Sequence, residues 1–298
     1  MPFSAVFPPM ATPFTPDGAV DVTGIHKNVR LLSSTGLGGI VALGSNGEAP
    51  LLDEAESDVV IGETRQALDR GVLIAGTGRE STPATIAASV RAARLGADAV
   101  LVRTPSYFKG RMTTDAFVRH YQAVADACPV PVLLYNYPAV TGVNLGPDAI
   151  TQLSEHPNIV GVKETGSDTA QVAAYVAAAR PGFAVLAGSA PTFYPSLCVG
   201  ASGAILAAAC VVPDICVHVF EHFHAGRHDD ARELQARLTP LAKLVTTVHG
   251  VPGLKAAMDL AGFIGGVPRG PLAPVPADAV DQIRTALDAL RAFVGAGQ

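Results

Sequence analysis

The chain of 298 residues contains 49% hydrophobic and only 16% charged residues, a composition typical of a globular protein with a large core. Its formal net charge of −5 provides no electrostatic attraction to nucleic acid or to an anionic membrane surface, so we expect neither as a partner. No stretch approaches the ~20 uninterrupted apolar residues of a membrane span, and the N-terminal residues lack the pattern of a secretory signal. The four cysteines are scattered without zinc-like spacing, which indicates buried thiols in a reducing compartment and favours the cytoplasm.

Eight short apolar runs follow one another along the chain, and an amphipathic segment follows each of them. The runs are SAVFPPMATPF (4–14), GGIVALGS (38–45), VLIAGTG (72–78), ADAVLVRTP (97–105), VPVLLYN (130–136), IVGVKETG (159–166), FAVLAGS (183–189) and ASGAILAAA (201–209). Apolar strands that alternate with helices indicate a parallel sheet covered on both faces, and eight of them favour an α/β fold of the (β/α)8 TIM barrel type over residues 1–225. The alternative is a Rossmann-like open sheet, but GTGRES (76–81) has Ser81 where the third glycine of the phosphate fingerprint belongs.

Residues 214–298 have a helical pattern throughout, which is more than the single helix needed to complete a barrel. We therefore predict that residues 226–298 form a C-terminal helical extension packed on the barrel. HVFEHFHAGRH (218–228) contains four of the eight histidines, and His218 and His222 have the spacing of a helical metal pair. Nothing else in this segment completes a metal site, so we expect no metal there.

The active site of such a barrel lies at the carboxyl ends of its strands. Hydroxyl side chains dominate these ends, with few of the carboxylates and histidines that a divalent metal needs. Lys163 alone among the five lysines ends an apolar strand. One interpretation is a structural ion pair, although Glu164, as the next residue in the strand, points to the opposite face. The other is a Schiff-base nucleophile, because desolvation in a barrel mouth lowers the ordinary lysine pKa of ~10.4 and frees the amine.

Tyr135 ends the preceding strand at the height of Lys163. Neighbouring parallel strands lie ~4.8 Å apart, so its phenol can reach the lysine nitrogen and move protons during imine chemistry. The alternative is a core tyrosine whose hydroxyl merely finds a partner. GSNGE (44–48) is predicted to be a turn bounded by glycines, and the backbone N–H groups of such a turn can bind a carboxylate. The Ser45 hydroxyl provides a further hydrogen-bond donor and a possible link in a proton relay.

These motifs resemble the dihydrodipicolinate synthase / N-acetylneuraminate lyase family of class I, pyruvate-handling aldolases. The resemblance covers nearly the whole chain, through FPPMATPF, GSNGE, TPSY, YNYPAVTG, GVKETG and LAGSA to the C-terminal helices. YNxPxxTG followed by GVK is a specific signature of the family. The stretches GRESTPAT (78–85), YFKGRM (107–112), HPNIVGVK (156–163) and GVPGLKAAMDLAGFIGG (250–266) are most similar to its 4-hydroxy-2-oxoglutarate aldolase branch.

The resemblance implies that Lys163 forms a covalent imine with a small 2-oxo acid, without any cofactor. It implies that Tyr135 transfers protons through a relay with Ser45, which Tyr107 of a neighbouring subunit completes. The resemblance also implies a homotetramer built as a dimer of dimers, and a site that borrows Tyr107 across an interface would explain why the subunits associate.

The resemblance also assigns the substrate-binding residues. Ser45 and Asn46 would hold the C1 carboxylate, Thr165 would face the C4 hydroxyl, and Gly188 and Ile205 would line the site through backbone groups. The reaction implied is cleavage of a 4-hydroxy-2-oxo acid, 4-hydroxy-2-oxoglutarate above all, to pyruvate and glyoxylate.

One position departs from the synthases of the family. They carry an arginine five residues after the catalytic tyrosine, and this chain has Val140 there, which offers no partner for a carboxylate. The departure argues against dihydrodipicolinate synthase and leaves open what holds a distal carboxylate. Two further alternatives, 2-keto-3-deoxygluconate aldolase and N-acetylneuraminate lyase, would use the same imine. A third, a metal-dependent aldolase, would use a metal ion in its place. A non-catalytic 2-oxo-acid binding protein would be expected to lack Lys163 or Tyr135, and both are present.

Overall fold

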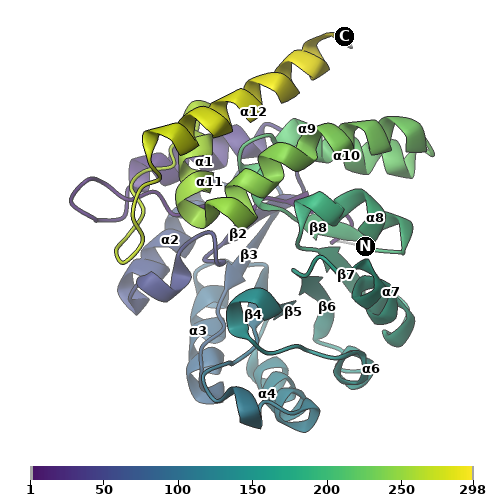
Figure 1. Cartoon of the computed structure of the whole chain (residues 1–298). Coiled ribbons are helices and arrows are strands. Elements are labelled where there is room, and N and C mark those ends of the chain that lie inside the picture. The colour runs from purple at the N-terminus through teal and green to yellow at the C-terminus, as the bar shows by residue number, and fades with distance from the viewer. Residues whose placement is uncertain (1–2, 297–298) are drawn as a thin grey trace.

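Eight parallel strands form one sheet that closes on itself inside a layer of helices (Figure 1). This is a computed structural model, and it describes residues 3–296. The strands are β1 (Val6–Phe7), β2 (Gly39–Ala42), β3 (Val72–Gly76), β4 (Ala99–Arg103), β5 (Val132–Asn136), β6 (Ile159–Glu164), β7 (Ala184–Ala187) and β8 (Gly203–Ile205). They are hydrogen-bonded in the order β1-β8-β7-β6-β5-β4-β3-β2, and a parallel bridge between Pro9 and Val41 joins the two ends of the series. Each strand lies inside one predicted apolar run, so the barrel prediction is confirmed and the Rossmann-like alternative is wrong.

Helices follow the strands along the chain and cover the outside of the barrel (Figure 1). They are α1 (Val22–Ser33), α2 (Glu54–Ala67), α3 (Thr82–Arg94), α4 (Thr114–Ala127), the short α5 (Pro138–Thr141), α6 (Pro147–Ser154), α7 (Thr169–Ala178) and α8 (Phe193–Cys198). Polar residues in the preceding loops begin several of them by accepting N–H groups that the first turn leaves unpaired. At α2, Asp53 and Glu56 each accept the backbone N–H of the other in a capping box. Asp21 caps α1 and Ser81 caps α3.

Side chains inside the barrel alternate along each strand with side chains that face the helices. The interior cluster includes Phe7, Val41, Ile74, Leu101, Leu133, Leu186 and Ile205. Arg103 and Tyr135 stand two residues beyond Leu101 and Leu133, and Arg103, Tyr135 and Lys163 are in register on β4, β5 and β6. Because side-chain direction repeats every two residues, all three point into the carboxyl-terminal mouth of the barrel.

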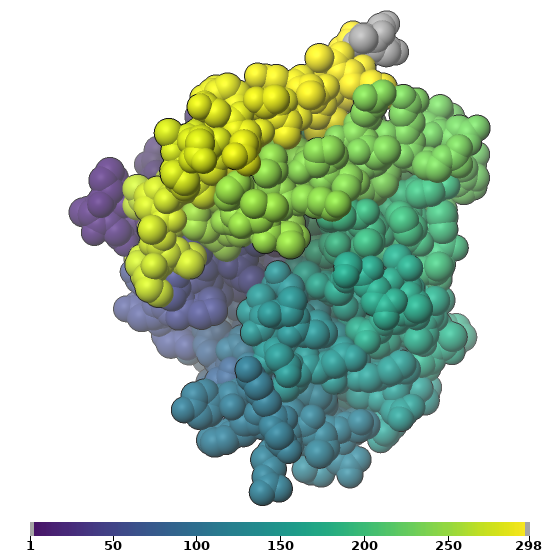
Figure 2. All heavy atoms as spheres, viewed as in Figure 1, coloured from purple at the N-terminus to yellow at the C-terminus, as the bar shows by residue number. Residues whose placement is uncertain are grey.

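The C-terminal helices lie along one side of the barrel. They are α9 (Pro213–His224), α10 (His228–Lys243), α11 (Gly250–Leu260) and α12 (Ala277–Ala296). One apolar cluster joins them to β1 and β8, and Figure 2 shows their light-green and yellow atoms as a continuous layer. The predicted domain boundary between residues 225 and 226 lies in the turn between α9 and α10, and it stays a prediction. None of the helices described is both long and apolar enough to cross a membrane.

The prediction that residues 214–298 are helical throughout is wrong for residues 261–276. This segment contains four prolines and four glycines, and proline lacks the N–H group that a helix interior requires. The segment bonds to the barrel instead: Asn28 on α1 donates to the carbonyl oxygen of Ile264 at 2.7 Å and accepts its N–H at 2.8 Å. It therefore ties the extension back to the barrel near α1 and α2 (Figure 1).

Candidate active site

Lys163 is the last but one residue of β6, in the barrel mouth, and only 4% of the residue is exposed. Its Nζ lies 4.3 Å from the centroid of the Tyr135 ring. Glu164 points to the other face of the strand, where it accepts hydrogen bonds from Asn136 at 2.7 Å and Gln171 at 2.8 Å. No carboxylate of residues 3–296 lies within ion-pair distance of the lysine. The structural ion pair considered from the sequence is therefore not formed, and Lys163 is a buried amine without a counter-ion in the described chain.

Burial lowers the pKa of Lys163 from 10.5 to about 7. About half of the amines are then neutral at pH 7, whereas well under 1% are neutral at the ordinary lysine pKa. Cys210, from the turn after β8, lies close enough to affect this pKa. Burial raises its own pKa to about 12, so it is a neutral thiol, and its Sγ donates to the carbonyl oxygen of Pro9 at 3.3 Å. A neutral lysine nitrogen is what attack on a ketone requires.

Tyr135 is buried beside Lys163, with its hydroxyl 3.2 Å from Ser45 Oγ. Burial raises the pKa of Tyr135 to about 12, against the opposing effect of the Ser45 and Thr165 hydroxyls. The Thr165 hydroxyl is near enough to act on this pKa but forms no hydrogen bond of normal geometry with the phenol. The phenol is therefore protonated at neutral pH. It can donate its proton to a reacting group and take one back, with the Ser45 hydroxyl in hydrogen-bond contact.

Two non-glycine residues in the left-handed region flank the turn that carries Ser45. Leu43 has φ 57° and Glu48 has φ 55°, a backbone conformation that persists only where the surroundings enforce it. Thr12 supports the turn by donating its hydroxyl to a carbonyl oxygen there at 2.7 Å. The backbone N–H groups of Ser45 and Asn46 donate to no acceptor in the part of the chain described. Two adjacent free N–H groups in such a turn suit an anion, so this turn can bind a carboxylate.

A buried ion pair fastens the same turn to the C-terminal extension. Glu48 lies 2.5 Å from Nζ of Lys255 on α11, and both side chains are 1% exposed. Lys255 also donates to the carbonyl oxygen of Val267 at 2.8 Å, and the N–H of Arg269 donates to Glu48 at 2.8 Å. Sequence reasoning missed this pairing, because nothing local to Lys255 indicates a partner in a distant turn.

Thr165 and Gly188 lie in direct contact after β6 and β7. A Cβ atom at Gly188 would stand 2.1 Å from Thr165 Oγ1, so only glycine fits there without displacement. Thr165 Oγ1 is buried and has no hydrogen-bond partner among the described residues. A buried hydroxyl without a protein partner commonly binds water or a ligand. Ile205 ends β8 and is fully buried in the interior cluster.

Tyr107 and Val140 lie on the surface, with 78% and 65% of each residue exposed. The Tyr107 ring packs edge-on against Phe108, with ring centroids 5.1 Å apart. Within the described chain Tyr107 makes no hydrogen bond to Ser45 or Tyr135. The structure of one chain therefore does not bring Tyr107 into the site, and its role across a subunit interface stays a prediction.

His218 and His222 lie on α9 with ring centroids 6.3 Å apart. His222 Nδ1 accepts a hydrogen bond from Nε of Arg227 at 2.8 Å. Residues 3–296 contain no group of three or more His, Cys, Asp or Glu side chains that could hold a metal ion.

A cavity of about 280 Å³ opens between the turn after β2 and the ends of β3, β4 and β5. Its lining includes Gly44, Ser45, Gly78, Arg79, Glu80, Arg103 and Tyr135. Sequence reasoning missed the charged members of this set. The signal for Arg103 was present, since it shares the interior face of ADAVLVRTP with Ala99 and Leu101.

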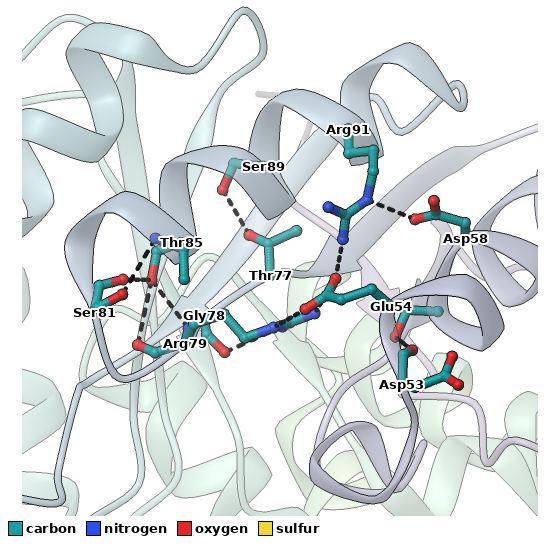
Figure 3. Close-up of polar contacts among 12 residues, drawn as sticks. Asp53, Glu54, Asp58, Thr77, Gly78, Arg79, Ser81, Thr85, Ser89 and Arg91 are labelled. Atoms are coloured by element: carbon teal, nitrogen blue, oxygen red, sulfur yellow. Dashed lines mark hydrogen bonds and ion pairs between the residues drawn. The ribbon is translucent and has the colours of Figure 1, made fainter.

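Arg79 is held by residues of the surrounding helices. Its Nε and Nη2 donate to the two carboxylate oxygens of Glu54 at 2.9 and 3.2 Å (Figure 3). Arg91 on α3 binds the same carboxylate and also donates to Asp58 at 2.8 Å. This network joins α2, α3 and the loop after β3 at the edge of the cavity.

A closed (β/α)8 barrel with a buried lysine, a tyrosine and a hydroxyl relay at the carboxyl ends of its strands is characteristic of a barrel enzyme. Comparison with known proteins identifies the family to which the chain belongs. The pattern of the dihydrodipicolinate synthetase family matches residues 2–290. The chain therefore belongs to this family, and the prediction of a lyase-class enzyme is confirmed.

Three relatives illustrate the range of the family. The chain is 39% identical to a probable mitochondrial 4-hydroxy-2-oxoglutarate aldolase from Emericella nidulans, over 89% of this chain and 88% of the relative. It is 35% identical to a 4-hydroxy-tetrahydrodipicolinate synthase from Methanothrix thermoacetophila, over 98% and 99%. Among solved structures, a prophage protein of the dihydrodipicolinic acid synthase family from E. coli K12, in complex with pyruvate, superposes with a TM-score of 0.91 at 29% identity. That match covers 97% of this chain and 99% of the other.

Proposed function

We propose that the protein is a cofactor-free class I aldolase that cleaves 4-hydroxy-2-oxoglutarate to pyruvate and glyoxylate. The observation that carries the proposal is the buried Lys163 amine, whose pKa is lowered to about 7, in contact with Tyr135. Similarity to an aldolase named for this substrate supports its choice. The prediction of a cytoplasmic location stays a prediction.

The proposed reaction begins when the neutral Lys163 amine attacks the C2 ketone to give a carbinolamine. The Tyr135 phenol donates a proton to the carbinolamine hydroxyl, so water leaves, a protonated imine forms and Tyr135 is left as the phenolate. The imine accepts the electron pair of the C3–C4 bond as it breaks, while the C4 hydroxyl loses its proton. The Tyr135 phenolate, which the Ser45 hydroxyl 3.2 Å away stabilises by hydrogen bonding, accepts that proton. Glyoxylate leaves, and the enamine takes a proton at C3 from the Tyr135 phenol. Hydrolysis of the imine then releases pyruvate, returns a proton to Tyr135 and regenerates the neutral amine.

The substrate carboxylate next to the ketone is assigned to the N–H groups of Ser45 and Asn46, and the C4 hydroxyl to Thr165. The free N–H groups and the unpartnered buried hydroxyl support these assignments. Gly188 and Ile205 complete the wall of the site.

The test is borohydride reduction in the presence of pyruvate, followed by intact-protein mass. Wild type should gain one reduced pyruvate adduct, and Lys163→Ala should gain none. The control is Lys243→Ala, which removes an exposed lysine at the end of α10 and should keep the adduct. Wild type without an adduct would refute the mechanism, and an adduct on Lys163→Ala would refute the assigned nucleophile.

The second candidate is 4-hydroxy-tetrahydrodipicolinate synthase, because a relative of that name matches nearly the whole chain. The exposed apolar Val140 disfavours it, since a valine cannot bind the carboxylate of aspartate semialdehyde. Incubation with pyruvate and either glyoxylate or aspartate semialdehyde separates the two functions. Pyruvate consumption with aspartate semialdehyde but not with glyoxylate would favour the synthase.

The proposal includes a homotetramer, a dimer of dimers, in which Tyr107 enters the site of a neighbouring subunit. The exposure of Tyr107 and Phe108 supports an interface at this point. Mixing Lys163→Ala subunits with Tyr107→Ala subunits should restore activity, because some sites then combine the intact lysine with an intact tyrosine. Unrestored activity after subunit exchange, or a monomer by light scattering, would contradict the shared site.

A further inference from the structure

Arg103 is a charged side chain at a barrel-interior position. It stands two residues beyond Leu101, a member of the interior cluster, and it pairs in register with Tyr135 on the neighbouring strand. The side chain is only 28% exposed and lines the same cavity as Tyr135 and Ser45. A cation that is largely removed from water is favourable only where anionic or polar groups pair with its donors.

Gly78 makes room for this arginine. A Cβ atom at Gly78 would lie 2.6 Å from the backbone nitrogen of Arg103 and 2.7 Å from its Cγ. The arginine therefore packs closely over bare backbone at the end of β3. Its direction into the mouth follows from this close approach and from strand alternation.

The guanidinium of Arg103 is only partly bound by protein groups. Its Nη1 forms an ion pair with Glu80 at 2.8 Å and a hydrogen bond with the Thr104 carbonyl oxygen at 3.3 Å. Nε and Nη2 donate to no acceptor in residues 3–296. Arg79, the other arginine in the lining, has Nε and Nη2 both occupied by Glu54 (Figure 3).

The distances suit a substrate held by an imine on Lys163. Arg103 and Lys163 occupy strands on either side of Tyr135, in register, so their Cα atoms are about 10 Å apart, twice the strand spacing. In a five-carbon 2-oxo acid, three C–C bonds separate C2, the imine carbon, from C5, so these atoms lie at most about 4 Å apart. The long side chains of Lys163 and Arg103 can span the remaining distance between the strands and the substrate, one from each side.

We propose that Arg103 binds the distal C5 carboxylate of the substrate and thereby selects 4-hydroxy-2-oxo acids with a second carboxylate. This inference rests on the proposed function. Arg103 on β4 then supplies the partner that Val140 on α5 cannot provide. An arginine with two unoccupied neighbouring donors matches the planar geometry of a carboxylate.

The experiment compares kcat/KM for 4-hydroxy-2-oxoglutarate with that for 4-hydroxy-2-oxopentanoate, in which a methyl group replaces the distal carboxylate. In Arg103→Met, the ratio should fall by about 10- to 100-fold, mainly through KM for the dicarboxylate. Arg103→Lys should restore part of the ratio, because it keeps the charge and loses the planar fork. The matched control, Arg79→Met, removes an arginine from the same cavity and should leave the ratio within about threefold of wild type.

Failure of this inference can be distinguished from failure of the proposed function. Pyruvate lacks a distal carboxylate, so Arg103→Met should still form the borohydride-trapped adduct, which also shows that the variant folds. Absence of an adduct in wild type would refute the proposed function. An adduct in both proteins, with an unchanged ratio in Arg103→Met, would overturn the role of Arg103 alone.

Discussion

Replacing Lys163 with methionine should stabilise the folded protein while it removes the proposed nucleophile. Burial lowers the pKa of this amine from 10.5 to about 7, so the folded state binds fewer protons than the unfolded state between these pH values. Stability of the wild type therefore rises with pH across this window. The loss of folding free energy caused by burying this amine is fully present below pH 7 and disappears above pH 10.5. At pH 7 it is on the order of 4 kcal/mol, and at pH 9 it is about 2 kcal/mol.

Methionine has an unbranched apolar side chain and does not titrate. The free energy of unfolding of the variant should therefore exceed that of wild type by about 4 kcal/mol at pH 7 and about 2 kcal/mol at pH 9. The chain contains no tryptophan, which makes far-UV circular dichroism in urea the suitable measurement, at a fixed protein concentration. The matched control is Lys255→Met, which leaves the buried Glu48 side chain without its partner at 2.5 Å. That variant should lose about 3–5 kcal/mol.

The outcome that refutes the reasoning is a destabilised Lys163→Met protein. A gain that is equal at pH 7 and pH 9 would also refute it, because the stabilisation would then be independent of the titration of the amine.

Three further substitutions test other parts of the site. Tyr135→Phe should lower kcat for pyruvate release by about 10²- to 10⁴-fold, and an unchanged kcat would exclude Tyr135 from proton transfer. Gly188→Ala should reduce the free energy of unfolding by about 1–3 kcal/mol, because its Cβ would meet the Thr165 hydroxyl at 2.1 Å. The control Gly62→Ala on α2, where nothing lies within 4 Å, should stabilise by about 0.5–1 kcal/mol, and equal effects in urea would contradict the clash. Thr165→Val should leave stability unchanged or slightly higher and raise KM, since the hydroxyl has no partner among residues 3–296; a large loss of stability would show a structural role.

The strands could be predicted because their signal is local. Each apolar run between polar residues is a short segment that must be buried on both faces, and its length is too small for a helix. Lys163 was detectable for the same reason, since a charge at the end of such a run contrasts with its neighbours. The prediction of helix for all of residues 214–298 includes a segment that is not helical. Four prolines in residues 261–276 carry the opposite local signal, and they agree with the structure.

The sequence by itself determined the barrel, the strand that carries Lys163 and the residue types at the strand ends, because these depend on periodicity and composition along the chain. Tertiary structure alone decided which side chains meet. The pairing of Glu48 with Lys255 and the packing of Gly78 under Arg103 join segments whose separation in the chain carries no pattern. The pKa of Lys163 belongs to the same class of property, because desolvation depends on every strand that surrounds the amine.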